Sequence, residues 1–279
     1  MDSIYFAHRL SFHNFELPWH FENAYQILIV LRGRISYTVQ DNDYELGEKG
    51  IIVLNTMENH SLKVLEYPYE RVMLRVEPSR FYEEIKEPEL MSIFIKRTKE
   101  FKHAISVTDE AWENIKNSFI ALEKEYKRPD KYSDLMIWSE IRKIFVSLYR
   151  GSSMNNDSTA NSMLAVVSSA MNYMNKHFTE EITVDDLARV VMKSRDYLSH
   201  VFSKTTGLSI KQYLIRLRIN HAKFLLSESE KNISEIAEEC GYNDMNFFSR
   251  QFQSSTKMSP TSFRKLVRAQ NSLGKGNIE

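Results

Sequence analysis

The chain has 279 residues, enough for two domains, and its 37 basic side chains balance its 37 acidic ones. The single cysteine, Cys240, excludes a disulfide framework within the chain, and we expect it to be a small apolar filler beside a turn. The longest plausible strand core, residues 27–31, is far too short to cross a bilayer, and no apolar stretch of signal-peptide length opens the sequence. We therefore expect a cytoplasmic protein with no membrane partner.

The N-terminal part has the pattern of short β-strands separated by turns. Residues 27–31 form an apolar run, Gly33 is expected to break it, and residues 35–39 continue with alternating polarity. Turn-forming residues cluster at 41–43 and 46–50. Many short strands at this spacing predict a β-barrel or sandwich.

Glycine spacing and two histidines give this part a further pattern, carried by the runs PWHFENAYQILIVLRGRISYTV, YELGEKGIIVLN and NHSLKV. The pattern resembles a cupin-type sensor domain over roughly residues 10–80. Metal-binding cupins usually offer a His-X-His pair, a Glu and a later His. His20 and His60 resemble the first and last of these ligands, but the pair has one His only and Gln26 stands where the Glu would be.

A neutral amide is a poor ligand for a divalent metal, so we expect no metal, no cofactor and no catalytic residue. Two alternatives remain for the polar residues of this part. They line an effector pocket made of Trp19, His20, Gln26 and His60, or they are ordinary core and surface residues.

Two amphipathic helices are predicted next. Apolar residues recur at three- and four-residue spacing from Trp112 to Tyr126 and again from Leu135 to Leu148, with Pro129 between the two runs. The runs predict an antiparallel helical pair whose apolar stripes cover the barrel. The polar run at 151–159 predicts a flexible linker.

The remaining residues contain an internal repeat. Tyr197, Leu198, Ser199, Phe202, Ser209 and Tyr213 recur fifty positions later as Phe247, Phe248, Ser249, Phe252, Ser259 and Phe263. This period is typical of a duplicated supersecondary unit, and both copies have the pattern of a helix-turn-helix. Ala188 and Ala237 are only 49 apart, so one copy has a turn that is one residue longer.

Helix-end signals support both copies. The expected N-caps are Thr183, Ser194, Asn232, Asp244 and Ser259. Gly207 is placed to end a helix in a left-handed conformation. The faces expected to be buried consist of Tyr197, Leu198, Val201 and Phe202, and of Phe247, Phe248 and Phe252.

Residues 162–268 resemble the AraC/XylS family of bacterial transcription regulators. The family signature is carried by Ile233, Ile236, Ala237, Gly241, Tyr242, Asp244, Phe248, Ser249, Arg250, Phe252, Ser259, Pro260, Phe263 and Arg264. Lys257 replaces a usual glycine and therefore requires a left-handed lysine or another turn type, and Asn246 replaces a usual serine.

The resemblance implies an α+β protein with four parts. These are a cupin-like sensor at 1–108, the helical pair at 109–150, a linker at 151–160 and an all-α double helix-turn-helix domain at 161–279. It also implies that the chain binds double-stranded DNA, acts through RNA polymerase and forms a homodimer through one helix of the pair. Residues 160–279 carry 16 basic against 12 acidic side chains, which suits a phosphate-backbone partner.

The residues expected to touch DNA are Ser194, Arg195, Asp196, Ser199, His200, Lys204, Met245, Asn246, Ser249, Arg250 and Arg264. Arg250 can pair with guanine, Asn246 with adenine, and Met245 can touch a thymine methyl group. Asp196 accepts from cytosine or is simply a solvated charge at a helix start. Arg195, Lys204 and Arg264 are expected to contact phosphates.

The function predicted from these features is a DNA-binding transcription regulator, more often an activator in this family. Its N-terminal domain would sense a sugar, another small molecule or a partner protein. The alternative is a metal-dependent cupin enzyme fused to a DNA-binding module.

Overall fold

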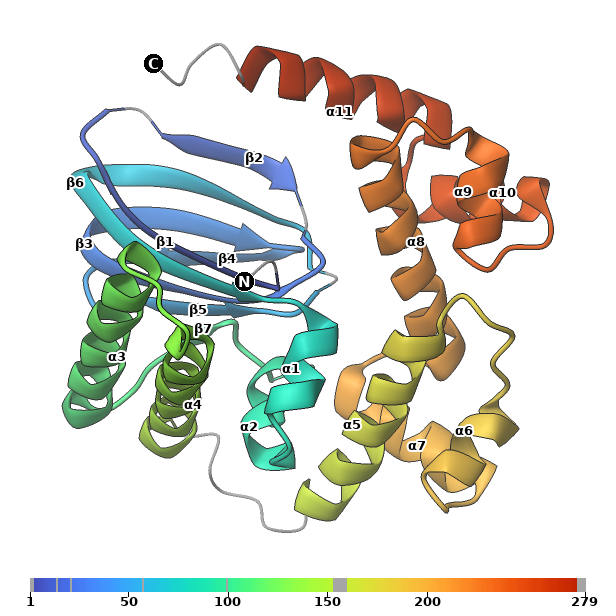
Figure 1. Ribbon diagram of the computed structural model, residues 1–279, viewed down its shortest axis with the longest axis horizontal. Helices are drawn as coiled ribbons and strands as arrows, with labels where there is room; N and C mark the ends of the chain where they lie inside the picture. The colour runs from blue at the N-terminus through green and yellow to red at the C-terminus, as the bar shows by residue number, and fades with distance from the viewer. Residues whose placement is uncertain are drawn as a thin grey trace. The chain divides into compact units, whose positions relative to one another are not determined.

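A computed structural model of the chain describes residues 3–13, 15–20, 22–56, 58–98, 100–152 and 160–274 (Figure 1). The chain forms two compact units, of which the first comprises Met1–Asn172 with Lys204–Gly207 and the second comprises Tyr173–Ser203 with Leu208–Glu279. The main boundary falls inside helix α5 (Ala160–His177). The predicted linker falls largely at 153–159, outside the described residues.

The first unit is built on an antiparallel sheet. Its strands are β1 (Ile4–Ser11), β2 (Glu16–His20), β3 (Tyr25–Val39), β4 (Asn42–Leu46), β5 (Ile51–Leu54), β6 (His60–Val76) and β7 (Ala104–Ile105). The order is β1-β6-β3-β5-β7, with β2 added to β6 and β4 added to β3. The unit therefore combines a β-sheet domain with helices, as an α+β class requires.

Gly33 bends β3 without ending it, so the prediction of two separate strands was wrong. Its φ is +85°, and a Cβ there would lie 2.6 Å from the Glu66 carbonyl oxygen, which leaves no room for a side chain. The register between β3 and β6 shifts on both sides of this glycine. A bulge of this kind sharpens the local bend and allows both long strands to curve.

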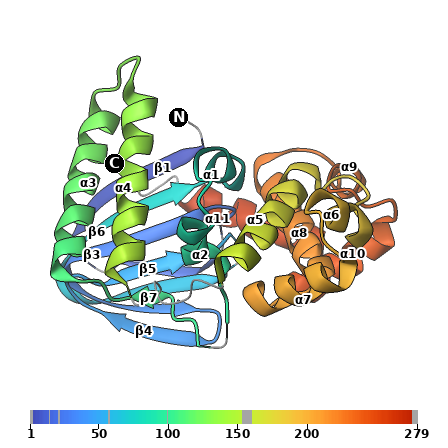
Figure 2. The same ribbon diagram turned by 90° about the horizontal axis from the view of Figure 1, so that it is seen from below.

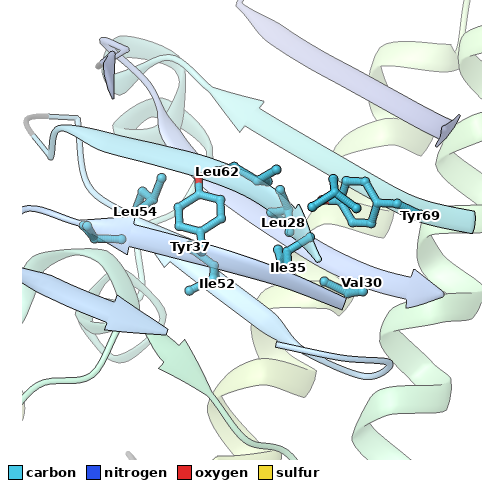
Figure 3. Packing of buried hydrophobic residues seen from close by; sticks show 10 residues of the cluster. Leu28, Val30, Ile35, Tyr37, Ile52, Leu54, Leu62 and Tyr69 are labelled. Atoms are coloured by element: carbon cyan, nitrogen blue, oxygen red, sulfur yellow. The ribbon is translucent and has the colours of Figure 1, made fainter. Parts of the chain in front are cut away.

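The two faces of the sheet have different partners. On one face, Phe6 of β1 packs against Phe119 and Tyr126 of a covering helix, with ring centroids 6.2 and 5.5 Å apart. The other face, called here the interior face, gathers a buried cluster of side chains from β3, β5 and β6 (Figure 3). That cluster contains Leu28, Val30, Ile35, Tyr37, Val39, Ile52, Leu54, Leu62, Val64 and Tyr69.

The predicted helical pair is present as α3 (Asp109–Lys127) and α4 (Ser133–Gly151), which lie side by side along the sheet (Figure 2). Leu148 is fully buried, but Leu135 is 63% exposed and does not belong to the buried stripe that the sequence predicted. Gly151 is the last residue of α4 and packs against Ala111, so it is not part of a linker. Two short helices, α1 (Pro78–Glu84) and α2 (Pro88–Ile95), precede the pair.

The second unit contains the two predicted helix-turn-helix copies. The first copy is α6 (Val184–Val190) with α7 (Arg195–Thr206), and the second is α9 (Ile233–Glu239) with α10 (Met245–Thr256). Helix α8 (Ile210–Glu228) joins them, and α11 (Pro260–Gly274) follows. The turn of the second copy, at 240–244, is one residue longer than the turn at 191–194, as the sequence indicated.

The repeat extends to side-chain packing. The Phe202 and Tyr213 rings lie 5.6 Å apart at 73°, and their counterparts Phe252 and Phe263 lie 5.5 Å apart at 75°. Cys240 is fully buried in the core of the second copy, and burial raises the pKa of its thiol to about 12. This thiol is therefore a packing residue, as expected.

The predicted helix ends are confirmed. Thr183 and Asn232 form complete capping boxes with Asp186 and Glu235. The Tyr197 amide donates to Ser194 Oγ at 3.2 Å, the Phe247 amide donates to Asp244 Oδ1 at 2.8 Å, and the Ser262 amide donates to Ser259 Oγ at 3.1 Å. Gly207 has φ +70°, and Lys257 adopts the left-handed conformation at φ +62°.

Candidate nucleic-acid interface and ligand site

Helices α7 and α10 each bury one side and expose the other. The buried side chains of α7 include Leu198, Val201 and Phe202, and the buried side chains of α10 are Phe248 and Phe252. The predicted DNA-contacting residues that are exposed are Ser194, Arg195, Asp196, Ser199, His200, Lys204, Met245, Asn246 and Arg250. Ser249 is half-buried. Each copy therefore offers a polar helix face that begins at a capped N-terminus.

Three of the predicted contact residues already have partners within the protein. Ser194 accepts the amide hydrogen that caps α7, and Arg195 lies 3.5 Å from Asp185 in an exposed ion pair. Arg264 is half-buried and donates from Nη2 to the Lys231 carbonyl oxygen at 2.6 Å. The bond from Arg264 ties α11 to the segment before α9, so in this structure the side chain supports the fold.

Two aromatic residues that were predicted to be buried are exposed. Tyr197 is 38% exposed and Phe247, its counterpart in the repeat, is 41% exposed. Each immediately precedes the buried residue that starts the core stripe of its helix, and one residue turns the side chain by about 100°. Both rings therefore border the polar faces of α7 and α10, a position that apolarity alone does not reveal.

The predicted effector pocket is only partly assembled. His20 and His60 meet, with ring centroids 4.1 Å apart, and His60 stacks on Tyr37 at 5.7 Å. Burial is the main reason that the pKa of His60 falls to about 4, and the neighbouring His20 lowers it further. Trp19 is 57% exposed and does not join this buried group.

Gln26 lies on the interior face but pairs with other residues. It is 3% exposed, stands opposite Leu54 on β5 and opposite Arg75 on β6, and its Nε2 has no hydrogen-bond partner among the described residues. Arg75 also acts electrostatically on His60. Gln26 and the two histidines therefore share the interior face, where Arg75 lies near both Gln26 and His60. The sequence pattern did not indicate a role for Arg75.

A buried ion-pair network that the sequence pattern did not indicate joins Glu58, in the connection between β5 and β6, to Arg97 and His103, in the segment between α2 and β7. The Glu58 carboxylate accepts from Arg97 Nε and, at 3.1 Å, from Arg97 Nη2, and His103 Nε2 lies 3.1 Å from it. The backbone N–H of Asn55 also donates to the Glu58 carboxylate at 2.7 Å. Burial opposes ionisation, but Arg97 and His103 outweigh it and hold the pKa of Glu58 well below its usual range.

The described residues contain neither a group of possible metal ligands nor a membrane-spanning helix. Within that part of the chain, no three His, Cys, Asp or Glu side chains gather closely enough to hold a metal ion. Across the same ranges, no helix has both the length and the apolar character that a bilayer crossing requires.

Two family models match the chain. An AraC-like ligand-binding domain matches residues 5–113, and a helix-turn-helix domain matches residues 187–266. The first match spans the whole sheet and the start of α3. The second spans both helix-turn-helix copies.

Several known proteins are similar to this chain. The HTH-type transcriptional regulator YijO of Escherichia coli is 32% identical over 112 residues, which are 40% of this chain and 40% of YijO. The HTH-type transcriptional activator RhaR of Mannheimia succiniciproducens is 22% identical over 88% of this chain and 87% of its own length. The crystal structure of ToxT from Vibrio cholerae O395 has the same fold, with a TM-score of 0.56, 15% identity, and coverage of 96% of this chain and 99% of ToxT.

The fold and the exposed helix faces define a two-part protein, in which a β-sheet ligand-binding domain precedes a double helix-turn-helix unit. The chain belongs to the AraC family of transcription regulators.

Proposed function

We propose that this chain is a sequence-specific DNA-binding transcription regulator that reads DNA with α7 and α10. The observation that carries the proposal is the duplication of an exposed polar face on two capped helices. Helix α8 has 19 residues and is therefore roughly 28 Å long. Successive major grooves on one side of B-DNA lie about 34 Å apart, so a connecting helix of this length suits two adjacent grooves.

The proposal includes a division of roles among the exposed residues. Arg250 and Asn246 read base edges through bidentate contacts, and Met245 touches a thymine methyl group. His200 occupies the repeat position of Arg250 and reads a base in the first groove. Lys204 and Arg195 contact phosphates, the latter after exchanging Asp185 for DNA.

The ligand-binding domain, in this proposal, senses an effector in the cytoplasm and adjusts DNA binding, and the chain is not an enzyme. Its similarity to RhaR, which is named a transcriptional activator, supports activation through RNA polymerase. The interior face of the sheet is the effector site, and His20, Gln26 and His60 border it.

The proposed regulator is a homodimer that associates through α3 and α4. These helices and the turn between them expose four large apolar side chains, Ile120 (59%), Tyr132 (57%), Leu135 (63%) and Met136 (44%). A groove of about 630 Å³ between α3 and α4 is lined by other residues of the same two helices, among them Ala121, Ser139 and Val146. A second copy of the pair would bury the four exposed apolar side chains.

Replacing Leu135 by Lys is therefore expected to weaken self-association at least tenfold, because a charge would be buried in the interface. Sedimentation velocity of the full chain checks this. Leu10→Lys, at a 51% exposed leucine of β1, is the matched control and should leave association unchanged. Leu148 cannot serve in this test, since it is fully buried and its replacement would unfold the unit. A wild-type protein that is monomeric at working concentrations, with and without DNA, would contradict the dimer.

Replacing Arg250 by Ala is expected to cost about 1–3 kcal/mol on the preferred DNA site and to relax the preference at one base pair. The preferred site is first obtained by selecting binders from a random DNA library with the full chain. Affinities for that site and its single-base variants are then measured over a range of salt concentrations.

Lys204→Ala provides the contrast. It should weaken binding to all sequences alike and reduce the magnitude of the salt dependence by about one unit of slope. An Arg250→Ala protein that loses affinity equally on every sequence would show that Arg250 holds phosphate. A library selection that enriches no sequence would overturn the proposed function.

A further inference from the structure

The interior face of the sheet carries four polar atoms that are buried without a hydrogen-bond partner among the described residues. They are Gln26 Nε2, Tyr69 Oη, Arg71 Nη1 and Arg75 Nε, and their four residues are called here the donor cluster. Within it, the Arg71 guanidinium lies 5.4 Å from the Tyr69 ring centre and acts electrostatically on the Tyr69 hydroxyl. Native proteins leave few buried polar groups unpaired, because each one loses its hydrogen bonds to water. Four on a single face of one sheet require a physical reason.

Strand register shows that these residues share a face. Tyr69, Arg71 and Arg75 alternate along β6, so their side chains lie on the same side of the strand. Arg75 stands opposite Gln26, and Arg71 stands opposite Val30, a member of the interior apolar cluster. The donor cluster therefore lies at the border of that apolar interior.

Tyr37 lies near three members of the donor cluster, Tyr69, Arg71 and Arg75. It is 1% exposed and sits in the middle of the interior cluster (Figure 3). Burial raises the pKa of its phenol, and Arg71 and Arg75 both oppose that rise, while Tyr69 and Glu22 add to it. One buried hydroxyl thus lies within electrostatic reach of both guanidinium groups.

All four unpaired atoms can donate a hydrogen bond, and three of them, the Gln26 amide nitrogen and the two guanidinium nitrogens, cannot accept one. The charges are also unbalanced. Arg75 pairs through Nη1 with Glu22, but Arg71 has no carboxylate partner in the described part of the chain and lies over the Phe15 ring at 4.3 Å. Among the described residues, the face therefore has more unpaired donors than acceptors, and Glu22 balances only one of the two guanidinium charges.

We propose that the donor cluster binds the carboxylate or phosphate group of a small organic anion, and that this anion is the effector. The inference rests on the proposed function, in which the interior face is the effector site. Guanidinium groups match the planar or tetrahedral oxygens of such groups through paired hydrogen bonds. The apolar side chains beside them would contact the rest of the molecule.

A neutral sugar fits these observations less well. Each of its hydroxyl groups both donates and accepts, so it would bring donors to a face that already has an excess of them. It would also leave the Arg71 charge without a counter-charge, which an oxyanion supplies.

The test uses thermal unfolding of the full chain followed by tryptophan fluorescence. The three tryptophans are Trp19, Trp112 and Trp138, so the signal reports on the first unit. The probes are inorganic phosphate against chloride at matched ionic strength, then glucuronate and glucose 6-phosphate against glucose. The proteins are wild type, Arg71→Gln, Tyr69→Phe and the control Arg34→Gln, which removes an exposed arginine of β3.

An oxyanion at about ten times its Kd should raise the melting temperature of the wild type by about 3–6 °C. Arg34→Gln should keep this increment, Arg71→Gln should lose it, and Tyr69→Phe should reduce it. In chloride, Arg71→Gln should melt close to the wild type, because removing a half-buried charge that lacks a carboxylate offsets the loss of its contacts with the Phe15 and Tyr69 rings. Comparison of glucuronate with glucose 6-phosphate then tells a carboxylate effector from a phosphate one.

Equal increments in all four proteins would indicate a general salt effect and overturn the proposal. So would the absence of an increment in the wild type, or stabilisation by glucose that survives Arg71→Gln. If Arg71→Gln does not fold, Tyr69→Phe decides, and an unreduced increment in that protein overturns the proposal.

The same proteins separate this inference from the proposed function. Arg71→Gln should prefer the same DNA sequence as the wild type. If no protein in the set shows a DNA preference, the regulator proposal fails whatever the anions do. If the preference is normal and only the anion results fail, the ligand class alone is wrong.

Discussion

Replacing Glu58 by Gln is expected to lower the free energy of unfolding of the first unit by about 3–5 kcal/mol. Glu58 is 5% exposed and its carboxylate pairs with Arg97 through two guanidinium nitrogens. Gln keeps the shape of the side chain but removes the charge. The variant would therefore leave a guanidinium in a largely buried site without its counter-charge, which is the costly part of breaking such a pair.

Urea unfolding followed by tryptophan fluorescence measures this loss, because all three tryptophans lie in the first unit. Glu66→Gln is the matched control, since its ion pair with Arg34 has a similar length, 2.7 Å, but both side chains are about half exposed. Exposed pairs contribute about 0–1 kcal/mol. Equal losses in the two variants would show that burial does not strengthen the Glu58 pair.

The stability of the first unit is expected to fall by about 1.5 kcal/mol between pH 6.5 and pH 5 through His60 alone. The pKa of His60 is about 4 in the folded protein, because the ring is buried and lies beside His20. In the unfolded chain it returns to about 6.5. Over this range His60 therefore binds more proton in the unfolded chain than in the folded protein. Acidification then favours unfolding, and the stability is undiminished only above pH 6.5.

His60→Gln isolates this contribution. Urea unfolding of wild type and variant at several pH values should give curves that diverge between pH 6.5 and pH 5, with the steeper fall in the wild type. The other histidines are common to both proteins, among them His8, whose pKa is raised by Glu123 and Glu70 despite its partial burial. Parallel curves would mean that folding does not lower the pKa of His60.

The sequence predicted the second unit in more detail than the first because its signals are local. A cap such as Asp244 accepts a hydrogen bond from a backbone amide three residues away. A fifty-residue repeat can be recognised by comparing one segment of the chain with another. The period of the apolar stripe placed Phe248 and Phe252 correctly. It misplaced Tyr197 and Phe247, since a residue at the edge of a stripe is buried or exposed according to what packs beside it.

The first unit depends on contacts between distant residues, which a pattern does not contain. The Glu58 and Arg97 partners are 39 residues apart, and Arg75 meets Gln26 only through the pairing of β3 with β6. Gly33 was recognised as a break, but whether a glycine ends a strand or bends it depends on the strand that pairs with it. Pro78 and Pro88 were available signals, as each stands at the first position of a short helix that was not predicted.

In the proposed function, two repeated units of one chain read two adjacent major grooves. A hydroxyl-radical footprint of the full chain on its selected DNA site tests it most directly. Each bound chain should protect two successive stretches on one side of the duplex, about 34 Å apart, and Arg250→Ala should weaken protection in one of them only. Protection of a single groove by each bound chain, or equal weakening of both stretches by Arg250→Ala, would contradict it.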